Sequence, residues 1–238
     1  MDKLPKEWKW EYIGNISKIT SGIGFPKSFQ GNPSGYIPFL KVKDISNTVL
    51  NGKTVTTEAD NYISYEDCNK LNGKPLEKGT VVFAKIGEAI HLNRRALLGQ
   101  PSLIDNNVMG VKVFRPLLDA LMFYYLSTIK LGDLSRATTV PSIRKSDVEQ
   151  IPFPLIPVKE QCLIVQEIDR YFSIADEVEE IVNKNSMQSQ SLRQSILKSA
   201  FKGKLVPQDP NDEPASVLLE RIKSEKAKSK KSKQMEIL

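Results

Sequence analysis

Apolar residues recur at helical spacing through one long stretch in the second half of the chain, residues 161–203. Three prolines stand just before it, between residues 152 and 157, and the stretch holds neither proline nor glycine until Gly203. Steps of three and four residues between apolar positions are typical of an amphipathic helix with a narrow apolar seam. At 1.5 Å per residue, about forty residues form a rod of roughly 60 Å. We therefore expect one long helix.

The seam of this helix needs a second helix to cover it, from this chain or from another copy. The other helical segments are far shorter, so the partner is expected to come from outside. Nine residues are assigned to the interface: Ile164, Ile168, Tyr171, Ile174, Val178, Ile181, Asn185, Leu192 and Ile196. With Tyr171 at heptad position a, polar Asn185 and Gln188 fall at core positions. Either they fix the register and orientation of a coiled coil, or the helix bends there and both reach water.

Residues 1–157 show short apolar runs separated by turns, and they predict a mixed α+β domain around a curved sheet. The strand signals lie at residues 36–45, 78–87, 91–98 and 106–114. In the first of these, apolar and polar residues alternate, which places Lys41 and Lys43 on the outer face of a strand. A short helix is expected at 119–130. The domain boundaries expected are 1–157, 158–203 for the long helix, and 204–238 for an irregular segment with a basic tail.

The formal net charge of +6 is unevenly distributed. Residues 1–157 carry a net charge of +5, residues 158–220 carry −4, and residues 221–238 carry +5. The last block is rich in Lys and Ser and holds no aromatic residue, so it predicts a disordered, solvated end. The excess on the first block is compatible with a surface that faces phosphates, although many domains of this charge bind no nucleic acid.

The sequence gives little support for a catalytic site or a metal site. His91 is the single histidine and has no adjacent acidic residue to orient it, and the carboxylates are not clustered as a two-metal nuclease requires. Cys68 and Cys162 are isolated, which argues against a disulfide framework or a zinc site. Gly22 and Gly24 predict a turn rather than a phosphate-binding loop. Because no apolar run suits a signal peptide or a membrane span, we expect a cytoplasmic protein that catalyses nothing by itself.

Residues suited to DNA contact gather in several clusters of the first domain. Arg and Lys read guanine edges, Asn and Gln read adenine edges, and Lys, Arg, Ser and Thr contact phosphates. The candidates for DNA binding, chosen by charge and loop placement, are Lys41, Lys43, Lys85, Asn93, Arg94, Arg95, Thr138, Thr139 and Arg144. A solvated surface is the better explanation of any one cluster, but the combination of four in one domain favours a nucleic-acid face.

Several segments together resemble the specificity (S) subunit of type I restriction–modification systems. The segments are Pro-Phe-Pro-Leu-Ile-Pro-Val-Lys-Glu-Gln at 152–161, the blocks at 191–208 and 212–222, and, nearer the start, residues 4–8, 37–45, 79–87 and 138–143. The resemblance implies a target-recognition domain that reads a DNA half-site in the major groove. It also implies a long helix that acts as a ruler and docks the modification subunits. Those subunits methylate adenine N6 with S-adenosylmethionine, and a separate restriction subunit uses ATP and Mg; this chain is expected to bind no cofactor.

The chain departs from the family in one respect. Members of usual length have two recognition domains and two helices that pair antiparallel, whereas one of each is found here. The chain therefore resembles a half-length form, and we expect a homodimer with antiparallel helices that reads double-stranded DNA. Three alternatives remain: pairing with a different half to read an asymmetric site, a free-standing DNA-binding or scaffold protein without a methyltransferase partner, and an enzyme in its own right.

Overall fold

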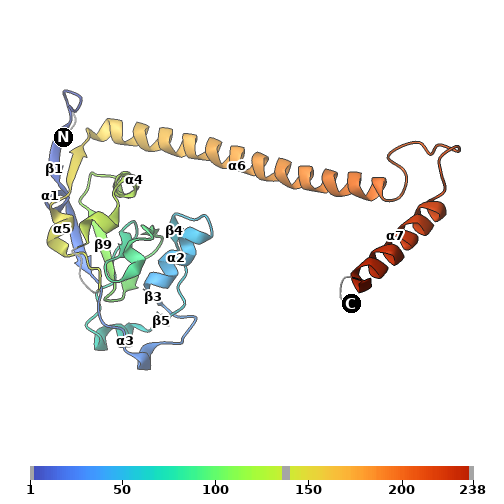
Figure 1. Cartoon of the computed structure of the whole chain (residues 1–238). Helices are drawn as coiled ribbons and strands as arrows, with labels where there is room; N and C mark the ends of the chain where they lie inside the picture. The colour runs from blue at the N-terminus through green and yellow to red at the C-terminus, as the bar shows by residue number, and fades with distance from the viewer. Residues whose placement is uncertain (1–2, 136–139, 236–238) are drawn as a thin grey trace. The chain divides into compact units, whose positions relative to one another are not determined.

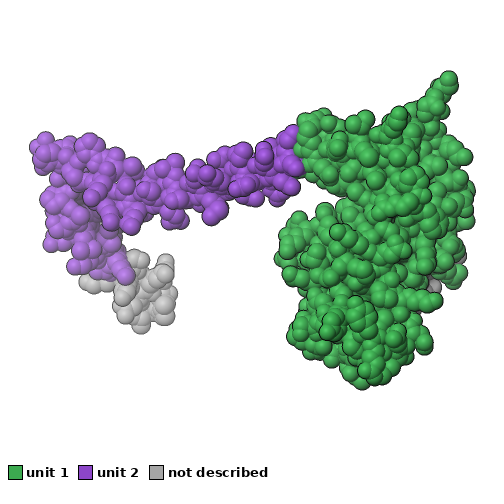
Figure 2. All heavy atoms as spheres, turned by 180° about the vertical axis from the view of Figure 1, so that it is seen from behind, with its two compact units in different colours: residues 1–172 green, residues 173–238 purple. Residues whose placement is uncertain are grey.

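The computed structural model describes residues 3–135 and 140–235 (Figure 1). The chain divides into two compact units, residues 1–172 and residues 173–238, which Figure 2 shows in different colours. The division falls inside the longest helix, so the first unit contains the start of that helix as well as the α+β domain.

The described strands of the first unit form three sheets. The largest has five strands in the order β2 (Ser17–Ser21), β9 (Val108–Val113), β6 (Val81–Ala84), β7 (Arg95–Leu98) and β4 (Val55–Thr56). A three-stranded sheet has the order β5 (Tyr62–Ile63), β3 (Ile37–Leu40) and β8 (Leu103–Ile104), and a two-stranded sheet pairs β1 (Lys9–Tyr12) with β10 (Pro152–Leu155). The pairing of β1 with β10 is antiparallel and joins the two ends of the domain.

The helices connect and cover these sheets. The α-helices are α1 (Ile13–Ile16), α2 (Val42–Leu50), α3 (Tyr65–Lys70), α4 (Asp119–Thr128), α5 (Lys145–Glu149), α6 (Val158–Ala200) and α7 (Ala215–Met235). Short 3₁₀ helices are η1 (Lys27–Phe29), η2 (Glu88–Ile90) and η3 (Leu131–Leu134).

The five-stranded sheet is buried on both faces, as the alternation along β6 shows. Val81 and Phe83 point into the larger core cluster, with Met122 and Leu126 of α4 among its members. Val82, one position along, belongs to a second cluster on the opposite face. Alternate side chains of a strand point to opposite faces, so the short apolar strand at 81–84 can serve two cores at once.

The structure confirms the mixed α+β class and the long helix, and it corrects two details. Among the described residues, the strands expected to form a curved sheet are divided among three sheets. The strand expected over residues 36–45 ends at Leu40, and α2 begins at Val42. Asp44 causes the change, because its Oδ2 accepts a hydrogen bond of 2.7 Å from the Lys41 backbone N–H and so caps the first turn of the helix. The placement of Lys41 and Lys43 on the outer face of a strand was therefore wrong.

The domain boundaries also differ from those expected. The first unit extends beyond residue 157 to Phe172, because the first turns of α6 pack against the domain, with Ile164 and Val165 contacting the larger core cluster. After α6, the segment expected to be irregular with a basic tail contains α7, which runs from Ala215 to Met235. Its Ala, Lys, Glu and Leu residues are good helix formers, which explains why a charged tail adopts a helix.

Among the described residues, the helices all fall short of the length and apolar character that a bilayer span requires.

Candidate nucleic-acid interface and helix surface

The turn at Asp105 joins several segments that are distant in sequence. The Asp105 backbone N–H donates to the Leu40 carbonyl oxygen at 2.9 Å, and its Oδ1 accepts from the Asn107 backbone N–H at 2.9 Å. Burial raises the pKa of the Asp105 carboxyl, while the bonds from Asn107 and the charge of Lys41 oppose this rise. We call this meeting point the Asp105 junction, and define it by residues 22–23, 40–41, 85–86, 105–107 and 142–144.

Glycine at position 22 permits the close packing of this junction. A Cβ at Gly22 would lie 1.9 Å from the Asp105 carbonyl oxygen, a separation that no real side chain tolerates. The Gly22 N–H donates to the Val108 carbonyl oxygen, and the next residue, Ile23, donates to Ile104. Gly22 therefore lets one backbone pass closely against another; instead of the expected turn, the chain continues from β2 and Ile23 forms a parallel bridge with Asp105.

Two candidate cations, Lys85 and Arg144, meet at the Asp105 junction. The Lys85 backbone N–H donates to Asn107 at 2.8 Å, and its carbonyl oxygen accepts from Ile143 at 2.9 Å. Ile86 forms an isolated antiparallel bridge with Ser142. The side chain of Lys85 is half-buried and that of Arg144 is exposed. The fold therefore brings Lys85, Arg144 and the two asparagines after Asp105 into one region. The sequence showed only that each is a residue type suited to DNA contact.

Lys41 and Lys43 lie at the start of α2 in different surroundings. The Lys41 ammonium donates to Gln30 Oε1 at 2.5 Å and lies 5.2 Å from the centre of the Phe25 ring. Lys43 is exposed and pairs with Asp60 at 2.7 Å, and this hydrogen bond raises its pKa. Lys41 belongs to the Asp105 junction, whereas the charge of Lys43 is partly balanced by its partner.

The prediction that Arg95 binds DNA was wrong. Its residue is only 4% exposed, and its Nη2 donates to Asn93 Oδ1 at 2.6 Å and to the Ile129 carbonyl oxygen at 3.0 Å. Burial lowers the pKa of this guanidinium to about 10. The Asn93 amide oxygen also accepts from the Leu131 backbone N–H at 2.8 Å. Arg95 is therefore a structural residue, held by Asn93, and its side chain does not reach a DNA surface.

The remaining predicted DNA-binding residues are Arg94, Thr138 and Thr139. Arg94 is half-buried beside the structural pair, and Thr138 and Thr139 lie outside the described residues. Asn106 is exposed and Asn107 is half-buried at the Asp105 junction. These two amides are not among the nine residues chosen from the sequence.

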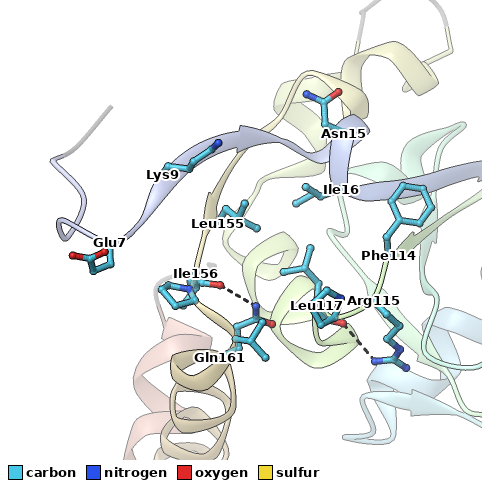
Figure 3. Close-up of a pocket in the computed structure, with 13 residues that line it drawn as sticks. Glu7, Lys9, Asn15, Ile16, Phe114, Arg115, Leu117, Leu155, Ile156 and Gln161 are labelled. Atoms are coloured by element: carbon cyan, nitrogen blue, oxygen red, sulfur yellow. Dashed lines mark hydrogen bonds between the residues drawn. The ribbon is translucent and has the colours of Figure 1, made fainter.

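The start of α6 is fastened to the domain by polar groups. Gln161 is 1% exposed; its Nε2 donates to the Ile156 carbonyl oxygen at 2.9 Å, and its Oε1 accepts from the Leu118 backbone N–H at 3.1 Å. Figure 3 shows the bond between Gln161 and Ile156 beside a pocket of about 450 Å³, lined with Ile16, Leu117 and Leu155 among others. The buried glutamine thus satisfies backbone groups that would otherwise be unpaired.

Three further contacts extend this attachment. The Trp8 indole N–H donates to Glu160 Oε2 at 2.9 Å. The Tyr124 hydroxyl donates to Asp169, and the Tyr124 ring lies edge-on to Phe172 with centroids 5.6 Å apart. The first four turns of α6 are therefore held against the α+β domain by side chains on one face of the helix.

The expected helix interface needs a correction at its beginning. Ile164 packs on the domain core and Ile168 is half-buried, so Ile164 does not belong to a free seam. At 100° per residue, Leu163 lies half a turn from Phe172 and on the same side as Ile181, eighteen residues later. Leu163 is 61% exposed. The outward face of α6 thus begins at Leu163, which the sequence analysis did not select.

The rest of the seam is exposed along α6. The exposed apolar residues of the predicted set are Tyr171, Ile174, Val178, Ile181, Leu192 and Ile196. Asn185 and Gln188, between them, are also exposed, and α6 continues through both without a break. Both polar side chains therefore lie on the surface of an unbroken helix in the single chain.

Comparison with known proteins gives a consistent family. Residues 5–187 match the model of the type I restriction modification DNA specificity domain. The chain is 25% identical over 241 residues to the type I restriction enzyme EcoDI specificity subunit of Escherichia coli, a match that covers 96% of this chain and 51% of that protein. It is 39% identical over 189 residues to the EcoKI specificity subunit of E. coli strain K12, covering 71% of this chain and 41% of the relative. The chain thus spans about half the length of the curated relatives it matches.

Solved structures share the fold. A chain from a structure on complex assembly and conformational transition of the type I R-M system superposes with a TM-score of 0.68 at 21% identity, over 86% of this chain and 48% of that one. The HsdS subunit from Thermoanaerobacter tengcongensis superposes with a TM-score of 0.60, also at 21% identity, over 86% and 47%. The family model covers well over half of the sequence, and this chain belongs to the type I restriction modification DNA specificity domain family.

Proposed function

We propose that this chain is a DNA sequence-recognition subunit of a type I restriction–modification complex, and that each copy reads one half of a bipartite target. The observation that carries the proposal is the family match over residues 5–187, which spans the whole α+β domain and the first thirty residues of α6. Relatives that match over most of this chain are named specificity subunits. On this account the chain itself is non-catalytic and acts in the cytoplasm, where its DNA partner is found.

The Asp105 junction is the proposed DNA-contact surface. Lys41, Lys85 and Arg144 supply positive charge for phosphates or guanine edges, and the Asn106 and Asn107 amides suit adenine edges. Buried Arg95 is excluded from this set, and Asn93 is assigned to holding Arg95. Lys43, Arg94, Thr138 and Thr139 remain secondary candidates from the sequence.

Pairing of α6 is proposed to join two recognition domains. The exposed seam from Tyr171 to Ile196 favours a second helix, and we propose the α6 of another copy, antiparallel to the first. A helix of 43 residues is about 65 Å long, so two domains carried at its ends would lie one or more DNA turns apart, a turn being about 34–36 Å. The target would be a split palindrome with a fixed spacer.

The remaining partners are proposed from the family. The complex would include a modification subunit that methylates adenine N6 with S-adenosylmethionine, and a restriction subunit that uses ATP and Mg. Both would dock on this chain, which holds none of those cofactors itself.

The test is to co-express this chain with the modification subunit and to map methylated adenines across the host genome. The proposal predicts one split palindromic site, with methylation that disappears when this chain is deleted. An asymmetric bipartite site would instead indicate pairing with a different half. DNA binding without any methylation would indicate a free-standing DNA-binding protein, and methylation by this purified chain alone would contradict its non-catalytic role.

A further inference from the structure

The polar and charged residues along the exposed seam of α6 favour one register for the antiparallel pair proposed above. In such a pair the a positions of one helix face the d positions of the other. Tyr171, Val178, Asn185 and Leu192 are a positions, and Ile174, Ile181, Gln188 and Ser195 are d positions. Asn185 and Gln188 interrupt the seam near its middle, and a buried side-chain amide is stable only beside another hydrogen-bonding group.

We propose that two copies of this chain pair in the register that places Asn185 of each copy opposite Gln188 of the other. The two amides can then donate to and accept from one another, which satisfies both. The next layers place Ile181 opposite Leu192 and Val178 opposite Ser195. This inference rests on the proposed antiparallel homodimer, and it adds which residues of the two copies meet.

The charges beside the seam independently favour the same register. The g positions, just before each a position, lie beside their counterparts on the other helix and set partner and orientation. Arg170, Glu177, Lys184 and Lys198 occupy these positions, and all four are exposed. In the proposed register Glu177 lies beside Lys198 of the second copy, twice by symmetry, and Lys184 lies beside Ser191.

Neighbouring registers bring like charges together. A shift of one heptad in one direction sets Lys184 beside Lys184 of the second copy and Arg170 beside Lys198. The opposite shift sets Lys184 beside Lys198. The one-heptad shift that opposes the two Lys184 residues also places Asn185 against Ile181, which leaves the amide without a polar partner. Polar layers and charge pairs therefore agree on a single alignment.

Charge reversal tests the register on the full chain. Glu177→Lys and Lys198→Glu each replace two attractive contacts with two repulsive ones, and each is expected to raise the dimer dissociation constant about tenfold. The double variant Glu177→Lys/Lys198→Glu restores the pairs and should return the constant to within about twofold of wild type. Glu180→Lys is the matched control, because it makes the same charge change at an outward position c and should leave the constant unchanged. Sedimentation equilibrium at low salt provides the measurement.

A cysteine pair provides a second measurement that does not depend on stability. In a Cys162→Ser background, Val178→Cys with Ser195→Cys should form a disulfide between copies under mild oxidation, whereas Val178→Cys with Gln188→Cys should not. A disulfide with Val178→Cys/Gln188→Cys but not with Val178→Cys/Ser195→Cys would contradict the register without contradicting the homodimer. The same conclusion would follow if the wild type is a dimer and neither Glu177→Lys nor Lys198→Glu changes its dissociation constant. A wild-type chain that sediments only as a monomer at micromolar concentration would overturn the homodimer itself.

Discussion

Gln161 accepts a hydrogen bond of 3.1 Å through its side-chain oxygen from the backbone N–H of Leu118, a residue 43 positions earlier in the chain. The same amide donates to Ile156 at 2.9 Å, and the residue is almost wholly buried. One side chain thus links α6, the turn before α4 and the strand segment before α6. Under the proposed function, α6 sets the distance between two DNA-reading domains and must be attached rigidly at its root, where Gln161 makes the most buried contact.

Gln161→Ala is expected to destabilise the first unit by about 2 kcal/mol, because it leaves a buried N–H and a buried carbonyl oxygen without partners. Urea denaturation gives the free energy of unfolding. Gln166→Ala, at an exposed position on the same helix, should change that free energy by less than about 0.5 kcal/mol. Equal effects of the two substitutions would show that the Gln161 contacts do not hold the helix.

The Tyr124 hydroxyl, which bonds to the first turns of α6, should make the stability of the protein depend on pH in the alkaline range. Burial, followed by the hydrogen bond to Asp169 and its charge, raises the pKa of Tyr124 to about 12 from an ordinary value of 10.0. Because the folded pKa is raised, the stabilisation is fully present below pH 10 and is lost as pH rises through 12. The stability difference between wild type and Tyr124→Phe should therefore be constant below pH 10 and shrink above it. A difference that stays constant to pH 12 would show that the hydroxyl contact is not formed.

Gly22→Ala should test the Asp105 junction. The added methyl group would collide with the Asp105 backbone, so the chain must shift, at a cost of about 2 kcal/mol or more. Gly24→Ala is the matched control, because a Cβ there meets nothing within 4 Å. Thermal unfolding of both variants measures the effect, and a Gly22→Ala protein as stable as the control would disprove the close approach.

Substitutions of Arg144 and Arg95 should distinguish a residue that contacts DNA from one that stabilises the fold. Arg144→Ala is expected to weaken binding to DNA and lower the slope of log affinity against log salt by about one, with little change in stability. Arg95→Ala should cost about 2–3 kcal/mol of stability, because a buried hydrogen-bonding network is removed, and should leave the salt slope of the folded protein unchanged. Lys70→Ala serves as the surface control, since Lys70 pairs with Glu66 on α3. A slope that falls with Arg95→Ala and not with Arg144→Ala would contradict the assignment.

The long helix was predictable because its evidence is local. No glycine or proline interrupts the apolar spacing between residues 161 and 203, and α6 runs from Val158 to Ala200. The choice of Ile164 for the seam failed because a helix offers two apolar faces near its root, and only the packed domain shows which one is covered. The angular position of Leu163, five turns before Ile181, was a signal available in the sequence.

The site was less predictable, because it depends on contacts between distant segments. The run Arg94-Arg95 has the composition of a charged surface, yet strand β7 turns Arg95 inward against Asn93. The start of α2 was missed because lysine is not a preferred N-cap residue, so the alternation along residues 36–45 favoured a strand. The meeting of Lys85 with Arg144 depends on backbone hydrogen bonds across nearly sixty residues, which spacing alone cannot reveal.

Distances between spin labels test the central claim, that two copies pair antiparallel through α6, most directly. In a Cys162→Ser background, labels on Met187→Cys of two copies should lie less than about 25 Å apart, since residue 187 faces residue 186 of the other copy. Labels on Asp176→Cys should lie roughly 35 Å apart, because 21 residues of helical rise, about 32 Å, separate the two copies at that position. Equal short distances at both positions would indicate a parallel pair, and no dipolar coupling at either would indicate that α6 does not pair; either result would contradict the account.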